Sequence, residues 1–134
     1  MSYSIPGIVL TLRSSGDMSS HQYKAVQAST TNHVDGCVVV AARGAKLTGV
    51  YQHNSTTQEA GAVMVSGVSK VLAGDSSAMA VGITAGLPVV ASSVGAAVAS
   101  TAAGQWLIGI ALEPLATGST GVIAVLLTPG AIST

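Results

Sequence analysis

The sequence predicts an all-β fold, a small β-barrel or β-sandwich, on three observations. No stretch combines an apolar face with a charged face at the 3.6-residue period of a helix. Short runs of Val, Ile, Leu and Ala recur along the chain and are separated by Gly, Pro, Asp, Asn and Ser, as in many short strands. These runs follow one another at roughly 8–12 residues, a spacing typical of sandwiches and barrels. The many small side chains favour a narrow, β-tulip-like barrel.

The first residues differ from the rest of the chain. The alternating run 8–13 suits an extended strand, and the polar stretch 14–20 that follows suits a linker or a long turn. We therefore expect an extended N-terminal arm over residues 1–20 and a single β domain over residues 21–134.

Ten further strands are expected in the β domain, each ending at a turn-forming residue. The four connections that the sequence marks best are a hairpin turn at 43–46, a loop at 54–59, a turn at 74–77 and a Pro/Gly/Ser/Thr connection at 113–121. The expected strands cover residues 22–28, 36–42, 47–53, 61–66, 69–73, 79–83, 88–92, 96–101, 106–112 and 122–127.

Internal similarity is loose. The stretches 61–65, 87–91 and 121–125 share a Gly or turn residue followed by an apolar strand. A recurrent pattern of turn plus strand accounts for these matches, so the sequence does not predict a repeat architecture.

The composition is poor in charge. Only 7% of residues are charged, five basic against five acidic, whereas about 25% is typical of soluble domains. A zero net charge provides no long-range field toward DNA, RNA or an anionic membrane, so we expect no nucleic-acid and no membrane partner. Such a surface favours association, which suggests a protein that is packed against neighbours.

Neither a membrane span nor an export signal is expected. A transmembrane helix needs about 20 predominantly apolar residues, and the best candidate, 78–99, is interrupted by Gly82, Gly86, Pro88 and Gly95. At the N-terminus Arg13 follows the apolar run, whereas in a signal peptide the positive charge precedes it.

Motifs for catalysis and metal binding are missing from the sequence. His21, His33 and His53 do not stand at metal-ligand spacing, and Cys37 lies in an apolar run that favours a buried thiol. The chain has no Gly-x-Ser-x-Gly elbow and no phosphate-binding loop. We therefore expect no enzyme activity, no metal and no cofactor. Trp106 begins an apolar strand and is expected to fill the core or a subunit contact.

Several strings occur in a characteristic order between residues 23 and 127. They are Lys24-Ala25-Val26, the strand 62–68, the turn and strand 83–90, the strand 95–99, the string Gly-Gln-Trp-Leu-Ile-Gly-Ile-Ala-Leu-Glu at 104–113, and the final strand 121–127. In this order the chain resembles the capsid cement or head-decoration proteins of tailed bacteriophages.

The resemblance implies a β-barrel or β-sandwich body on the outer surface of the expanded phage head, made in the host cytoplasm and assembled into the virion. The implied partners are the major capsid protein and further copies of the chain, as a homotrimer. The arm would contact the capsid as a strand added to a sheet edge, so that deleting residues 2–20 would abolish head binding without unfolding the body. Its candidate contact residues are Ile5, Pro6, Ile8, Leu10, Leu12 and Arg13.

Two alternatives remain open at this point. The first is a receptor- or carbohydrate-binding module of a spike or fibre, which would need exposed aromatic side chains. The second is a small β-barrel hydrolase, which would need Ser, His and Asp side chains to converge, for instance around His33 and Asp35.

Overall fold

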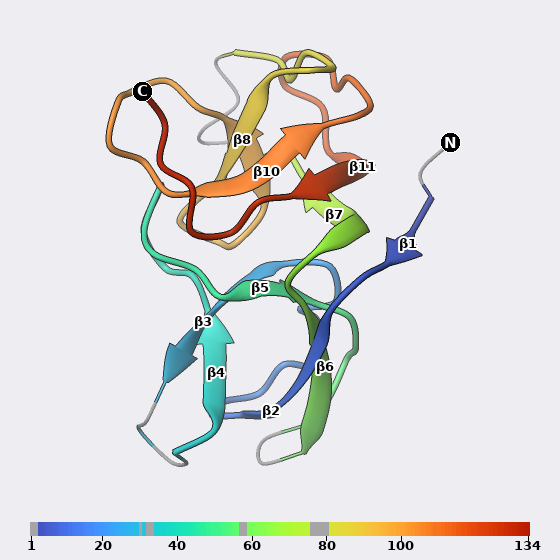
Figure 1. Ribbon diagram of the computed structural model, residues 1–134, viewed down its shortest axis with the longest axis vertical. Helices are drawn as coiled ribbons and strands as arrows, with labels where there is room; N and C mark the ends of the chain where they lie inside the picture. The colour runs from blue at the N-terminus through green and yellow to red at the C-terminus, as the bar shows by residue number, and fades with distance from the viewer. Residues whose placement is uncertain (1–2, 30, 32–33, 57–58, 76–80) are drawn as a thin grey trace.

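The computed structural model describes residues 3–29, 31, 34–56, 59–75 and 81–134 (Figure 1). This part of the chain contains strands and no helix, which confirms the all-β prediction, and accordingly no helix long and apolar enough to span a membrane occurs in it. The strands are β1 (Ile5–Pro6), β2 (Val9–Ser14), β3 (Ala25–Ser29), β4 (Gly36–Val39), β5 (Gly49–Tyr51), β6 (Ala60–Met64), β7 (Gly67–Ala73), β8 (Pro88–Ala91), β9 (Ala97–Ala99), β10 (Leu107–Ala111) and β11 (Gly121–Leu127).

The strands form two small barrels, one above the other in Figure 1. Barrel 1 is the closed ring β2-β4-β3-β5-β6. Barrel 2 has the order β7-β11-β10-β8-β9, and the ring closes because β9 also pairs with β7. Closure removes the open sheet edges that would otherwise invite aggregation.

The two barrels have the same topology. In each, the first strand runs parallel to the third, at Arg13 and Gly36 in barrel 1 and at Ala73 and Ala97 in barrel 2, and the other neighbours are antiparallel. The chain is therefore an internal duplication, in which β2 to β6 correspond in order to β7 to β11. The loose internal similarity of the sequence did not predict this repeat, which lies in the pairing of the strands.

Hydrogen bonds outside the strands repeat as well. The Tyr23 amide donates to the Tyr51 carbonyl over 2.7 Å, and the Gly86 amide donates to the Ala111 carbonyl over 2.7 Å. Tyr23 has a φ of 67° and Gly86 a φ of 89°, so both occupy the left-handed region. Tyr23 adopts a conformation that is unusual for a non-glycine residue at the position where barrel 2 has a glycine.

The N-terminal segment differs from the expected arm. From Ile5, which faces Val68, to Arg13, which faces Ala60, the chain runs antiparallel to β6 and the start of β7 in one constant register. The amide of Gly7 donates to the Ser66 carbonyl and links the two parts of this ribbon. Because β2 is a wall of barrel 1, residues 9–14 belong to the body, and a boundary at residue 21 would cut through the barrel.

Two buried clusters hold the fold together. The interior of barrel 1 contains Met18, Val26, Cys37, Tyr51 and Val63. The larger cluster joins the interior of barrel 2 to five residues of barrel 1, namely Ala25, Val40, Leu47, Val50 and Met64. The barrels thus share a core across their contact.

Most expected strands are present, some shorter than expected. The strand expected at 47–53 is limited to Gly49–Tyr51, and that at 96–101 to Ala97–Ala99. The strand expected at 79–83 falls partly outside the described residues, and Ile83 makes only an isolated bridge with Leu115.

Candidate docking surface

Catalytic and metal-binding groups do not converge in the part of the chain that is described. No group of three His, Cys, Asp or Glu side chains there could hold a metal ion. Asp35 faces Arg13, with Oδ2 3.6 Å from Nε, and His33 lies outside the described residues. Of the aromatic residues only Tyr3 is exposed, so the described surface has no stacking platform of the kind a carbohydrate or a single strand requires.

Cys37 is fully buried in barrel 1, and burial raises the pKa of its thiol to about 11. A thiolate is the reactive form, so this cysteine is expected to be inert in the folded protein. We predict no alkylation by iodoacetamide at pH 8 without denaturant and complete alkylation in denaturant, measured by mass spectrometry.

The raised pKa of Cys37 also links stability to pH. The unfolded thiol ionises near its ordinary value of 9.0, whereas the folded thiol stays protonated up to about 11, so stability should fall between these values as the pH rises. Labelling of the folded protein at a rate similar to that of the denatured protein would contradict the burial of this side chain.

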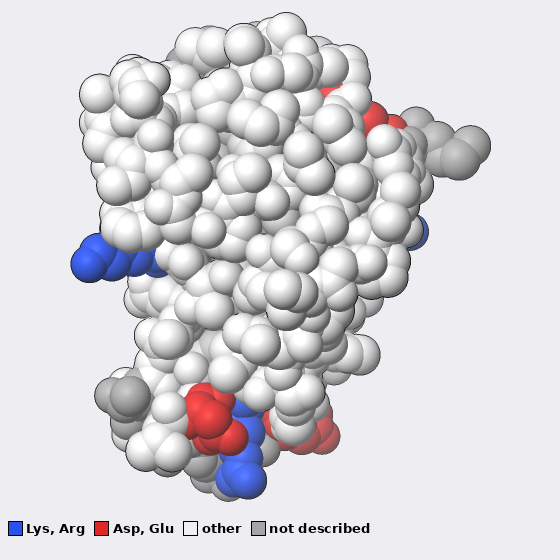
Figure 2. Space-filling view, viewed as in Figure 1, with Lys and Arg blue, Asp and Glu red and all other residues white. Residues whose placement is uncertain are grey.

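The charged residues are unevenly distributed between the barrels. Residues 67–134 contain Lys70, Asp75 and Glu113 as their charged side chains, and the others lie in the first half of the chain. On the face shown in Figure 2, most of the surface over barrel 2 is uncharged, whereas charged side chains gather at the far end of barrel 1. A surface of this kind favours contact with another uncharged surface.

Apolar side chains form a continuous row on the outside of barrel 2. Register partners in a sheet lie side by side on one face, and the pairs run from β1 through β7, β11 and β10 to β8. The row, which we call the apolar row, consists of Ile5, Val68, Leu126, Ile110 and Pro88. Ile5 is 59% exposed and Leu126 is 43% exposed, and the other three are half-buried.

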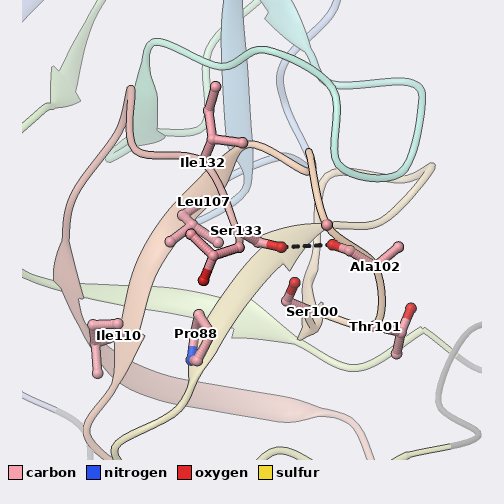
Figure 3. A pocket seen from close by; sticks show the side chains of 10 residues that line it. Pro88, Ser100, Thr101, Ala102, Leu107, Ile110, Ile132 and Ser133 are labelled. Carbon is pink, nitrogen blue, oxygen red and sulfur yellow. Dashed lines mark hydrogen bonds between the residues drawn. The ribbon is translucent and has the colours of Figure 1, made fainter.

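A shallow hollow continues the apolar row beyond β8 and β10. It has a volume of about 390 Å³, and Leu107, Ile110 and Pro88 form its apolar wall. Opposite them lie the loop at 100–103 and the chain end at 132–134, which the Ser133 hydroxyl ties together by donating to the Ala102 carbonyl over 2.5 Å (Figure 3). The hollow contains no charged side chain.

The structure separates the residues expected in the arm. Ile5, Pro6, Ile8 and Leu10 are exposed on the ribbon that crosses both barrels. Leu12 instead packs against the core of barrel 1, so it is not available to a partner. Pro6 has no amide hydrogen and lies in the edge strand β1, where a proline opposes the addition of another strand.

Trp106 lies where the two barrels meet. It packs against the shared core, its amide donates to the Gly44 carbonyl over 2.9 Å, and Lys46 Nζ lies 5.6 Å from the centre of its ring. The indole therefore contributes to the contact between barrels within one chain.

Sequence reasoning missed the other residues of the apolar row. Val68, Leu126, Ile110 and Pro88 are apolar residues in apolar strands, so nothing in the pattern distinguishes them from core residues. Their one signal is alternation with fully buried neighbours such as Val89 and Val125, which a closed barrel turns inward.

The fold and its charge-poor outer surface are typical of a structural protein that packs against other proteins. The family model described as phage cement protein matches residues 14–127, and the chain belongs to that family. It is thus a phage structural protein associated with the capsid.

Among solved structures, the chain is similar to the head fibre gp8.5 N base of bacteriophage phi29. The TM-score is 0.65 at 16% sequence identity, and the match covers 91% of this chain and 94% of that one. At this identity the likeness concerns the fold. No curated protein sequence matches the chain.

Proposed function

We propose that this protein binds the outer surface of the expanded phage head, through the major capsid protein, and stabilises the capsid lattice without catalysing a reaction. Membership of the phage cement family carries this proposal, and the exposed, uncharged apolar surface supports it. We also propose that it acts as a homotrimer on the outside of the virion.

The stabilisation would follow from mass action. A protein that binds the intact expanded shell and not its dissociated subunits lowers the free energy of the assembled state. Contacts repeated across a lattice then add through avidity, even where each one is weak. Because the candidate contact surface is apolar, binding should depend little on salt.

The exposed side chains of the N-terminal ribbon are candidates for the capsid contact. Ile5 and Ile8 are the most exposed of them, at 59% and 61%. Deleting residues 2–20 would not test this role, because it would remove β2 and open barrel 1. Point substitutions at exposed positions are the suitable probes.

We expect the purified protein to co-sediment saturably with expanded heads that lack it, and not with unexpanded heads. Binding should persist from low salt to about 0.5 M NaCl, a range in which the Debye length falls to a few ångströms. The occupied heads should resist heating better than bare heads, as measured by release of packaged DNA.

An Ile8→Asp variant should bind expanded heads at least tenfold more weakly, because it places a charge in an apolar contact. Val34→Asp is the matched control, since Val34 is 95% exposed and lies beside Asp35, which contacts Arg13 at the opposite end of the ribbon from Ile8. Failure of the wild-type protein to bind either form of head would refute the proposed function.

A further inference from the structure

The duplication allows each residue of barrel 1 to be matched to its counterpart in barrel 2. The segment Gly44-Ala45-Lys46-Leu47-Thr48-Gly49-Val50 corresponds to Gly104-Gln105-Trp106-Leu107-Ile108-Gly109-Ile110. Gly44 and Gly104 both have positive φ, at 66° and 83°. Gly49 and Gly109 both lie against a backbone carbonyl of the next strand, that of Met64 and that of Leu126.

Barrel 1 uses an outer row of its own to contact barrel 2. Met64 faces Val50 and Val50 faces Ala25 in the ladder, so these three side chains share one face. That face is the outside of the barrel, because the adjacent Tyr51 and Val63 fill the interior. Nevertheless Met64 is only 4% exposed and Val50 and Ala25 are fully buried, since all three belong to the core shared with barrel 2.

The counterparts of these residues in barrel 2 are more exposed: Leu126 is 43% exposed, and Ile110 and Pro88 are half-buried. Leu126, Ile110 and Pro88 stand in the same register and form the centre of the apolar row. The hollow of Figure 3 is lined by Pro88, Ile110, Leu107 and Ser100, the counterparts of Ala25, Val50, Leu47 and Val40. The face that barrel 1 buries against barrel 2 is thus present a second time. In the described part of the chain it is partly exposed and is bordered by the loop at 100–103 and the chain end at 132–134.

Barrel 2 receives barrel 1 on the outside of β8 and β9. Val90 and Val98 face each other there and point outward, as Pro88 does, yet both are fully buried in the shared core. The Gly44 amide donates to the Ala91 carbonyl over 2.9 Å beside them.

The corresponding receiving face on barrel 1 is also partly exposed. Gln27 and Val38 are the counterparts of Val90 and Val98, face each other in the same way, and are half-buried. A hollow of about 360 Å³ adjoins them, lined by Gln27, Lys46 and Thr48 among others. Each chain therefore carries a second copy of both faces of the internal contact. We call Leu126, Ile110 and Pro88 of barrel 2 the donor face, and Gln27 and Val38 of barrel 1 the receiving face.

We propose that these two faces bind each other between copies: the Leu126–Ile110–Pro88 face of barrel 2 packs on the Gln27–Val38 face of barrel 1 in a second copy, as barrel 1 packs on barrel 2 within the chain. The proposal rests on the self-association included in the proposed function and identifies its surfaces. Such a head-to-tail contact is heterologous, so it generates a closed ring where the rotation permits closure.

Substitution of each face separately tests this interface. Leu126→Lys blocks the donor face and Gln27→Arg the receiving face, and we expect each to reduce the wild-type oligomer to monomer, by at least a tenfold loss of association. Val122→Lys is the matched control. Val122 is 39% exposed and lies on the same strand and face as Leu126. Its counterpart in barrel 1, Ala60, is exposed and is therefore not buried by the contact between the barrels. Multi-angle light scattering after gel filtration gives the masses, and thermal melting verifies that every variant is folded.

Mixing the two variants gives the decisive result. The donor face of Gln27→Arg and the receiving face of Leu126→Lys are both intact, so the mixture should form a one-to-one dimer that cannot grow. Three results would each overturn the proposal. The wild-type protein could be monomeric, Leu126→Lys could assemble as well as Val122→Lys, or the mixture could stay monomeric. Head binding is read separately, so a chain that assembles in this way but does not sediment with heads refutes only the proposed function.

Discussion

Gly109→Ala is expected to lower the free energy of unfolding by about 3 kcal/mol or more, near the upper limit for a single added methyl group. A Cβ at this position would overlap the Leu126 carbonyl oxygen and would lie 2.8 Å from its carbon and 3.0 Å from the Leu127 Cα. These are backbone atoms of the neighbouring strand β11, so no side-chain rotation relieves the overlap. The strands β10 and β11 would have to separate, which would open barrel 2.

Thermal melting measures this loss, which for a chain of this length corresponds to a decrease in Tm of roughly 10 °C. Gly16→Ala is the matched control, because a Cβ at Gly16 meets nothing within 4 Å and its φ is not positive. We expect the control to be neutral or slightly stabilising, since alanine restricts the unfolded chain more than glycine does. Equal melting temperatures for the two variants would contradict the close approach of β10 to β11.

The fold class and most strands could be predicted from the sequence because their signals are local. Alternation and turn residues act within a few positions of the chain, and this is the range in which sequence reasoning is strongest. The duplication could not be recognised in this way, because the barrels share a pattern of register and turns and few identical residues. Of the three similar stretches noted, 61–65 and 121–125 lie in the corresponding strands β6 and β11 but are two residues out of register, whereas 87–91 lies at β8.

The N-terminal segment illustrates a second limit. An alternating apolar run is equally compatible with a free arm and with a strand paired to its own chain. The distinction depends on whether residues 60–68, some fifty positions later, return alongside it. Long-range pairing of this kind leaves no mark on the segment itself.

The docking surface shows the same limit in another form. Leu126 and Val125 are neighbours in one apolar strand, yet one is 43% exposed and the other fully buried. Which side of a strand faces the interior is decided by closure of the barrel. Whether the outer side is then covered depends on the second barrel, as the contrast between Met64 and Leu126 shows.

The interior of barrel 1 depends on one large side chain, and removing it should be as costly as the change at Gly109. Tyr51 is fully buried, its hydroxyl is hydrogen-bonded to Ser55 Oγ, and it is the largest buried side chain among the described residues. Tyr51→Ala leaves a cavity and an unpaired buried hydroxyl, so we expect a loss of about 3–5 kcal/mol.

Gly61 makes this prediction more specific. A Cβ on Gly61 would collide with the Tyr51 hydroxyl and would lie 2.8 Å from the ring carbon Cε1, so Gly61→Ala alone should also destabilise, by about 1–3 kcal/mol. In the Tyr51→Ala background the collision is absent and the methyl group enters the cavity. The double variant should therefore be more stable than the sum of the single effects predicts, by at least about 1 kcal/mol in urea unfolding. Strict additivity would mean that the ring does not occupy the space above Gly61, and the packing of barrel 1 around Tyr51 would be incorrect.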